Sequence, residues 1–295
     1  MSTLRELKSR IGSVASTQKT TSAMKMISSA KMHKFTAQHQ RLMPYRNMVQ
    51  SVIGHLLATD VEFSSPLIAT REVKKVAMVV FGSDDGLCGA FNTYVLKFLL
   101  EAVAAAKEKF GKDVAITVIP VGKKIAKALN GVKKPQYKVQ MVDYMNTRST
   151  GDQLHDFTDM LRTSFLDGTF DQVDLVYMHF KSTSRQIPTR EQMLPVSYEA
   201  LAESADKKAA CAPCIFEPDA NSIFNSVLPL FIRSMMQEVF VESSASEQAA
   251  RVMAMQTASD NAKELLEDLN LEYNKLRQQG ITTELLDIIG GQVER

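Results

Sequence analysis

Residues 262–276 read AKELLEDLNLEYNKL, and the apolar side chains in this stretch return at alternating steps of four and three residues. That spacing holds one face of an α-helix against a neighbouring helix. Because no Pro follows Pro229 and no Gly stands between Pro229 and Gly280, the pattern predicts one helix over residues 219–292, on the order of 100 Å long. Its seam positions are Ala262, Leu266, Leu269, Tyr273 and Leu276.

Residues 1–57 predict a second long helix, reaching roughly 80 Å. Pro44 should bend it, because proline removes an internal hydrogen bond and crowds the preceding turn. Two such helices would pair as an antiparallel coiled coil and carry the residues between them as an insertion. A helical bundle is the alternative, but it needs a turn that residues 230–279 do not provide. The seam of this helix is expected to shift phase once, through Leu4, Leu7, Ile11 and Val14, then Thr20, Ala23, Ile27 and Ala30, then Phe35, Leu42, Val49 and Leu56.

The two ends of the chain carry opposite charge. Residues 1–59 contain nine Lys or Arg side chains and one acid, Glu6, whereas residues 260–295 contain eight acids and four basic side chains. The ends are therefore electrostatically complementary. Nucleic-acid binding is the rival interpretation of the basic arm. Only Phe35 and Tyr45 supply aromatic rings among its charges, so a solvated face or an acidic protein partner is favoured over nucleic acid.

The middle of the chain alternates strands with helices. The predicted strands are 76–81, 114–121 and 173–180, with 138–144 as an edge strand, and the predicted helices are 90–109, 123–129 and 153–166. This order predicts a Rossmann-like, mainly parallel domain over residues 73–205, followed by a linker at 206–218. The fold class is therefore α/β: a long antiparallel two-helix coiled coil with an inserted parallel-sheet domain.

Composition excludes several classes of protein. With 295 residues, 45% of them hydrophobic, the chain can bury a sizeable core. Three Cys are too few for a disulfide framework, which favours a reducing compartment. The charged N-terminal sequence predicts no signal peptide, and the lack of an apolar run of about 18 residues predicts no membrane span.

Residues 82–89, GSDDGLCG, follow the first predicted strand, where a doubly wound sheet binds nucleotide phosphates. The spacing of the three glycines matches neither common phosphate-binding motif, and Asp84 and Asp85 would repel phosphate. We therefore expect a structural turn and no cofactor. A free-standing nucleotide-binding protein remains the alternative function.

Cys211 and Cys214 form a C-x-P-C pair, which in redox proteins needs a thiolate at the start of a helix. A short linker with Pro213 and Pro218 gives little of that stabilisation, so a redox role stays a secondary hypothesis. No cluster has the ligand spacing of structural zinc, so no metal is expected. The five scattered His residues indicate no catalytic histidine.

Methionines are frequent on the two arms, where they would normally fill a core. On a two-helix coil, those that lie off the seam need a further surface, such as the inside of a sleeve. They are Met24, Met26, Met32, Met235, Met236, Met253 and Met255.

Four segments share motifs with one known family: residues 17–32, 83–92, 246–261 and 273–289. Together they resemble the gamma subunit family of rotary ATP synthases. Residues 17–32 (TQKTTSAMKMISSAKM) resemble its N-terminal helix, and residues 83–92 (SDDGLCGAFN) resemble its S-D-x-G-L-C-G motif. Residues 246–261 (SEQAARVMAMQTASDN) and 273–289 (YNKLRQQGITTELLDII) are similar to its S-E-x-A-A-R helix and its terminal motif. The four lie in the family's order and span nearly the whole chain.

The resemblance implies a non-catalytic shaft that turns inside a ring of three alpha and three beta subunits. The inserted domain and lower shaft would meet the epsilon subunit and the ring of c subunits. Proton flow would turn the shaft and force the beta sites through different nucleotide affinities. The complex would sit on the cytoplasmic face of a bacterial inner membrane.

The resemblance also implies site residues. Met24 matches a position near a beta lever, Lys25 would face acidic beta loops together with Lys8 and Arg10, and Arg277 and Gln278 match residues that grip beta. The positions tied to coupling along the helix pair are Arg251, Thr282, Glu284 and Asp287. The chain departs from the family at Asp85, where Arg or Lys is common, at Asp287, where Glu is usual, and at the Gly290, Gly291 and Gln292 end.

Overall fold

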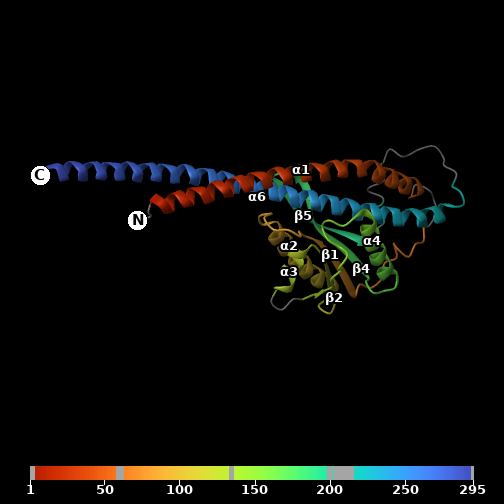
Figure 1. Ribbon diagram of the computed structural model, residues 1–295. Coiled ribbons are helices and arrows are strands. Elements are labelled where there is room, and N and C mark those ends of the chain that lie inside the picture. Colours follow the sequence, from red (N-terminus) through yellow and green to blue (C-terminus); the bar gives the residue numbers. More distant parts are fainter. Residues whose placement is uncertain (1–3, 58–62, 133–135, 198–200, 202–215, 294–295) are drawn as a thin grey trace. The chain divides into compact units, whose positions relative to one another are not determined.

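The computed structural model describes residues 4–57, 63–132, 136–197, 201 and 216–293 (Figure 1). The chain divides into two compact units, one formed by residues 1–29 with 251–295 and the other by residues 30–250. Helix α1 (Leu4–Leu57) and helix α6 (Ala220–Val293) each contribute a segment to both units. The predicted linker at 206–218 lies mostly outside the described residues, and Cys211 and Cys214 lie wholly outside them.

The first unit is an antiparallel pair of helix segments, one from each end of the chain (Figure 1). On α6, Ala262 and Leu269 are buried, and Leu266, Tyr273 and Leu276 are half-buried between exposed neighbours. The 3.5-residue seam predicted for α6 is therefore confirmed, because sheltered positions recur where one helix faces another.

The seam of α1 differs from the prediction. Sheltered positions run from Leu7 to Ser28 at steps of four and three with no change of phase, through Ile11, Val14, Gln18, Thr21 and Lys25. The predicted phase shift is wrong, since Thr20, Ala23, Ile27 and Ala30 are not the buried positions of this helix; Ser28 is. A steady 3.5-residue repeat keeps the same face of the helix toward the partner helix, whether the side chains on that face are apolar or polar. Polar side chains occupy the seam from Gln18 to Ser28, so hydropathy does not mark it in this part of the helix.

The second unit contains a five-stranded sheet in the order β3-β2-β1-β4-β5. Strands β1 (Lys75–Phe81), β2 (Ala115–Val121), β3 (Lys138–Val139) and β4 (Gln172–Ser182) are parallel, and β5 (Arg185–Leu194) pairs with β4 in the antiparallel sense. The helices of the insertion are α2 (Phe91–Phe110), α3 (Lys123–Asn130) and α4 (Gly151–Leu166). The Rossmann-like, mainly parallel sheet is thus confirmed, although β3 is shorter than the predicted 138–144.

Strand β5 was not predicted from the sequence. Its sequence, RQIPTREQML, is mostly polar and contains Pro188, which removes a backbone donor. Proline is tolerated because β5 lies at the edge of the sheet, where only one neighbour needs hydrogen bonds. The strand forms through its hairpin with β4, a contact that local propensity does not encode.

Two apolar layers hold the second unit together. On one face of the sheet, α2 and α3 pack over Val76, Met78 and Val80. On the other face, a larger cluster joins α4 to the second-unit parts of α1 and α6. This cluster includes Val49, Ile53, Leu56, Phe157, Phe224, Leu228 and Ile232. The inserted domain is therefore fixed to both long helices within this unit.

Candidate functional site on the long helices

The last turns of α6 expose an apolar surface. All the described side chains from Ile281 to Ile289 are exposed, and five of them are large and apolar. A cluster of exposed large apolar side chains is typical of an interaction surface. The exposed fractions are 50% for Ile281, 54% for Leu285, 63% for Leu286, 62% for Ile288 and 59% for Ile289. We refer to these five residues as the α6 tip. They were absent from the predicted site, although their apolar character is plain in the sequence.

Four predicted contact residues lie in the same part of α6. Arg277, Gln278, Thr282 and Glu284 are all exposed. Thr282 uses its hydroxyl to donate to the Gln278 backbone carbonyl at 2.9 Å, within the helix. The side chain of Asp287 lies outside the described residues. The predicted polar contacts and the α6 tip therefore share one helical segment.

The other predicted contact residues are sheltered. Met24 and Lys25 are half-buried, and Lys25 occupies a seam position on α1. Arg251 is only 6% exposed, so its own chain covers it. The structure therefore separates the predicted set into an exposed group, Arg277, Gln278, Thr282 and Glu284, and a sheltered group, Met24, Lys25 and Arg251.

The methionines divide in the same way. Met32, Met235, Met236 and Met255 are buried, as expected for core filler. Met26 is 65% exposed and Met253 41% exposed, and both belong to the first unit. Because two paired helices can bury only one seam, these side chains add to the apolar surface of that unit.

The loop after β1 is held by its own side chains. The carboxylate of Asp84 accepts hydrogen bonds from the Lys123 backbone at 3.0 Å and from the backbone and hydroxyl of Thr147 at 3.0 and 2.7 Å. Partial burial opposes ionisation, but these hydrogen bonds prevail and lower the pKa of Asp84. Asp85, the departure from the family pattern, pairs with Arg148 at 2.6 Å on the exposed surface.

The same loop packs closely against α2 and α3. A Cβ at Gly82 would meet Ile125 at 2.4 Å, so this glycine is needed for close packing of the first strand against α3. The Ser83 backbone donates to the Asn92 side chain at 3.0 Å, and the Asp84 carboxylate occupies the N-terminus of α3. These contacts make the loop a structural turn.

The described residues contain neither a membrane-spanning helix nor a metal-binding cluster. None of the described helices is long and apolar enough to cross a membrane. Within the described ranges, no group of three His, Cys, Asp or Glu side chains is arranged to hold a metal ion.

The sequence matches known proteins along nearly its whole length. A family model described as ATP synthase matches residues 3–293. The chain is 41% identical to the ATP synthase gamma chain of Phocaeicola vulgatus, over 99% of this chain and 100% of that protein. It is 38% identical to the gamma chain of Bacteroides thetaiotaomicron, over 100% of both.

Solved structures give the same result. A chain of the Tetrahymena thermophila mitochondrial ATP synthase central stalk and c-ring aligns with a TM-score of 0.58 at 25% identity, covering 81% of this chain and 99% of that chain. A chain of the Euglena gracilis mitochondrial enzyme shares the fold, with a TM-score of 0.64 at 20% identity and coverage of 98% and 93%. The chain belongs to the ATP synthase gamma chain family.

Proposed function

We propose that this chain is the central rotor subunit of an ATP synthase, which couples proton flow through the membrane sector to ATP synthesis or hydrolysis at the beta subunits. The observation that carries the proposal is the α6 tip, whose large apolar side chains extend beyond the sheltered seam. Such a surface suits a low-friction bearing inside a ring of subunits, because apolar contacts are non-directional and let the shaft turn.

The helix pair supplies the shaft. A continuous seam on each helix resists separation of the two strands when torque is applied. The inserted domain is packed on α1 and α6 through the cluster that includes Ile53, Phe157 and Phe224, so force applied to the domain reaches both helices. The subunit would itself be non-catalytic, which is in keeping with a loop after β1 that the hydrogen bonds of Asp84 to Lys123 and Thr147 hold as a structural turn.

The partners in this proposal are three alpha and three beta subunits around the shaft, with epsilon and the c-ring at the inserted domain and lower shaft. The similar Tetrahymena chain comes from a central stalk with a c-ring, which supports this assignment. The complex would be peripheral on the cytoplasmic face of a bacterial inner membrane, in keeping with the bacterial sources of the similar gamma chains.

The exposure of each predicted site residue suggests how it would act in the complex. Arg277, Gln278 and Glu284 would bind the alpha and beta ring directly, because their side chains are exposed. Thr282 lies among them, and Asp287 is assigned to the same surface. Met24, Lys25 and Arg251 would act by holding the helix pair in the shape that the ring senses.

Reconstitution tests the proposal. Alpha and beta subunits are mixed with and without this chain, and the products are separated by size and assayed for ATP hydrolysis. We expect a complex with one copy of this chain per three alpha and beta pairs, and activity that depends on the chain. Folded partners that form no complex with it would refute the proposal. One-to-one ATP binding by the isolated chain would favour the nucleotide-binding alternative.

A further inference from the structure

Helix α1 contains a weak point in the second unit. Pro44 lies inside the helix, which nevertheless runs from Leu4 to Leu57. Proline has no N–H, so the carbonyl of Gln40 loses its usual donor, and the ring crowds that same carbonyl. An interruption of this kind lowers the resistance of a helix to bending and local opening. A helix that transmits torque therefore needs support at this point.

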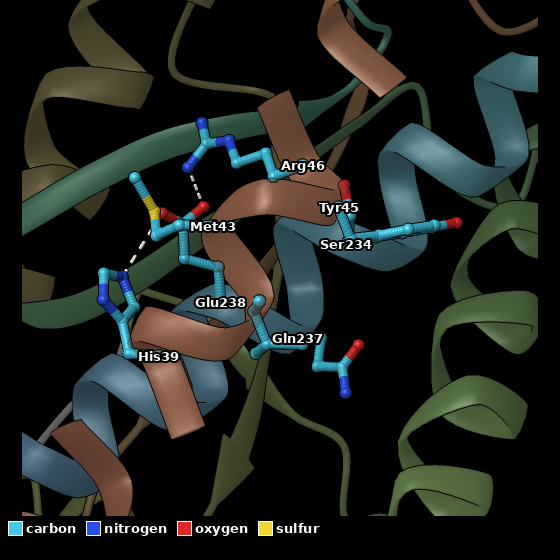
Figure 2. Close-up of a pocket in the computed structure, with 8 residues that line it drawn as sticks. His39, Met43, Tyr45, Arg46, Ser234, Gln237 and Glu238 are labelled. Atoms are coloured by element: carbon cyan, nitrogen blue, oxygen red, sulfur yellow. Dashed lines mark ion pairs between the residues drawn. The ribbon is translucent and has the colours of Figure 1, made fainter. Parts of the chain in front are cut away.

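Glu238 on α6 contacts α1 on both sides of the proline. Its Oε1 lies 3.5 Å from Nε2 of His39, and its Oε2 forms an ion pair with Arg46 (Figure 2). His39 and Arg46 are seven residues apart, which places them two turns apart on one face of α1. One carboxylate thus spans the interrupted part of the helix.

The three side chains are sheltered from solvent. The exposed fractions are 27% for His39, 25% for Arg46 and 14% for Glu238. Partly buried charges are screened less by salt than exposed ones, so the contacts persist at physiological ionic strength. The adjoining pocket, which Leu42, Met43 and Gln237 help to line, has a volume of about 10 Å³, room for about one water molecule. The site is therefore a contact between helices and too small for a ligand.

We propose that Glu238 is a positioning residue that splints α1 across Pro44, so that α1 and α6 turn as one body when the rotor is loaded. This inference rests on the proposed rotor function. Helix α6 carries no proline within four residues of Glu238, so the intact helix supports the interrupted one.

Glu242 provides a matched control one turn further along α6. Its carboxylate pairs with Nδ1 of His179 on β4 at 2.8 Å, so it joins α6 to the sheet instead of to α1. Both glutamate side chains are mostly buried, and each lies against a histidine nitrogen. Only Glu238 contacts residues on both sides of Pro44. The effect of removing its carboxylate should therefore depend on whether Pro44 is present, and the effect of removing the Glu242 carboxylate should not.

The test is a double-mutant cycle read by hydrogen exchange of the full-length chain. Glu238→Gln should speed amide exchange in α1 around residues 40–48 roughly two- to fivefold, as expected for the loss of a partly exposed ion pair. Pro44→Ala restores the donor to Gln40 and should suppress that increase. Glu242→Gln should leave exchange in α1 unchanged in both backgrounds.

Two results would overturn the inference. The first is that Glu238→Gln leaves amide exchange in α1 unchanged. The second is that Glu238→Gln speeds amide exchange in α1 equally in the wild-type chain and in the Pro44→Ala variant. If Glu238→Gln does not fold, His39→Gln and Arg46→Gln each remove one end of the bridge, and the same comparison with Pro44→Ala applies. Because exchange is measured without partner subunits, the outcome is independent of whether the chain assembles into a rotor.

Discussion

The hydroxyl of Ser246 donates a hydrogen bond of 2.8 Å to the backbone carbonyl of Met178, which ties α6 to β4 inside the second unit. Ser246 is fully buried, and Met178 is 4% exposed. The Met178 carbonyl thus accepts a hydrogen bond from outside the sheet. The serine of the SEQAAR segment therefore joins the shaft to the inserted domain.

Ser246→Ala should lower the free energy of unfolding by about 1–3 kcal/mol, because the Met178 carbonyl loses a buried donor. Ser244→Ala is the control. The Ser244 hydroxyl is also buried but donates to Phe240 within the same helix, and that carbonyl lies in the regular helical ladder. Urea unfolding of the two variants compares them directly. Equal losses of stability would contradict the assignment of Ser246 as the link to β4.

Asp84→Asn should destabilise the inserted domain by about 1 kcal/mol or more near neutral pH, because an ionised acceptor of three hydrogen bonds becomes a neutral one. The folded pKa of Asp84 lies below the ordinary value of 3.8. Its contribution is therefore complete above that value and is lost as pH falls through the folded pKa. Unfolding curves of the wild type and the variant should converge in acid.

Asp85→Asn supplies the comparison for Asp84. Asp85 pairs with Arg148 on the exposed surface, where an ion pair contributes roughly 0–1 kcal/mol. Its stability difference from the wild type should be small across the whole pH range. A larger loss of stability from Asp85→Asn than from Asp84→Asn would contradict the role given to the hydrogen bonds of Asp84.

Replacing Arg277 and Gln278 together by Ala should impair ATP turnover of the assembled complex and leave the isolated chain as stable as before. Both side chains are exposed, so the chain does not depend on them for its own folding. Gln279→Ala, at an exposed position next to them, should change neither property. Turnover that equals the wild type would remove Arg277 and Gln278 from the contact surface.

Leu286→Ser and Ile289→Ser should weaken assembly with alpha and beta without lowering the melting temperature of the free chain. These two members of the α6 tip are 63% and 59% exposed, so the free chain loses little buried apolar area. Binding of the labelled variants to alpha and beta measures the effect. Undiminished assembly would place the bearing elsewhere on the helices.

Much of the fold could be predicted from the sequence, because spacing carries information wherever side chains are apolar. The α6 seam and the three central strands are of this kind. The α1 seam was predicted correctly at Phe35, Leu42, Val49 and Leu56, which are sheltered. It was lost between Val14 and Phe35, because Gln18, Thr21 and Lys25 take the sheltered positions there. Strand β5 was missed because its pairing with β4, and not its own composition, creates it.

The site was predictable only in part. Motif resemblance pointed to Arg277 and Gln278, which lie on the exposed end of α6. The resemblance could not show that Arg251, unlike Arg277 and Gln278, is buried. Burial depends on which residues of the folded chain face each other. The bridge from Glu238 to both sides of Pro44 joins residues nearly two hundred positions apart, and no local pattern encodes such a contact.

The most direct test of the rotor function is rotation itself. A bead is fixed to the inserted domain through an exposed Lys112→Cys substitution, in a complex with alpha and beta anchored to a surface. We predict that ATP drives the bead in one direction, because successive nucleotide states of the surrounding sites act on an asymmetric shaft. A complex that contains this chain and hydrolyses ATP while the bead does not turn would contradict the account.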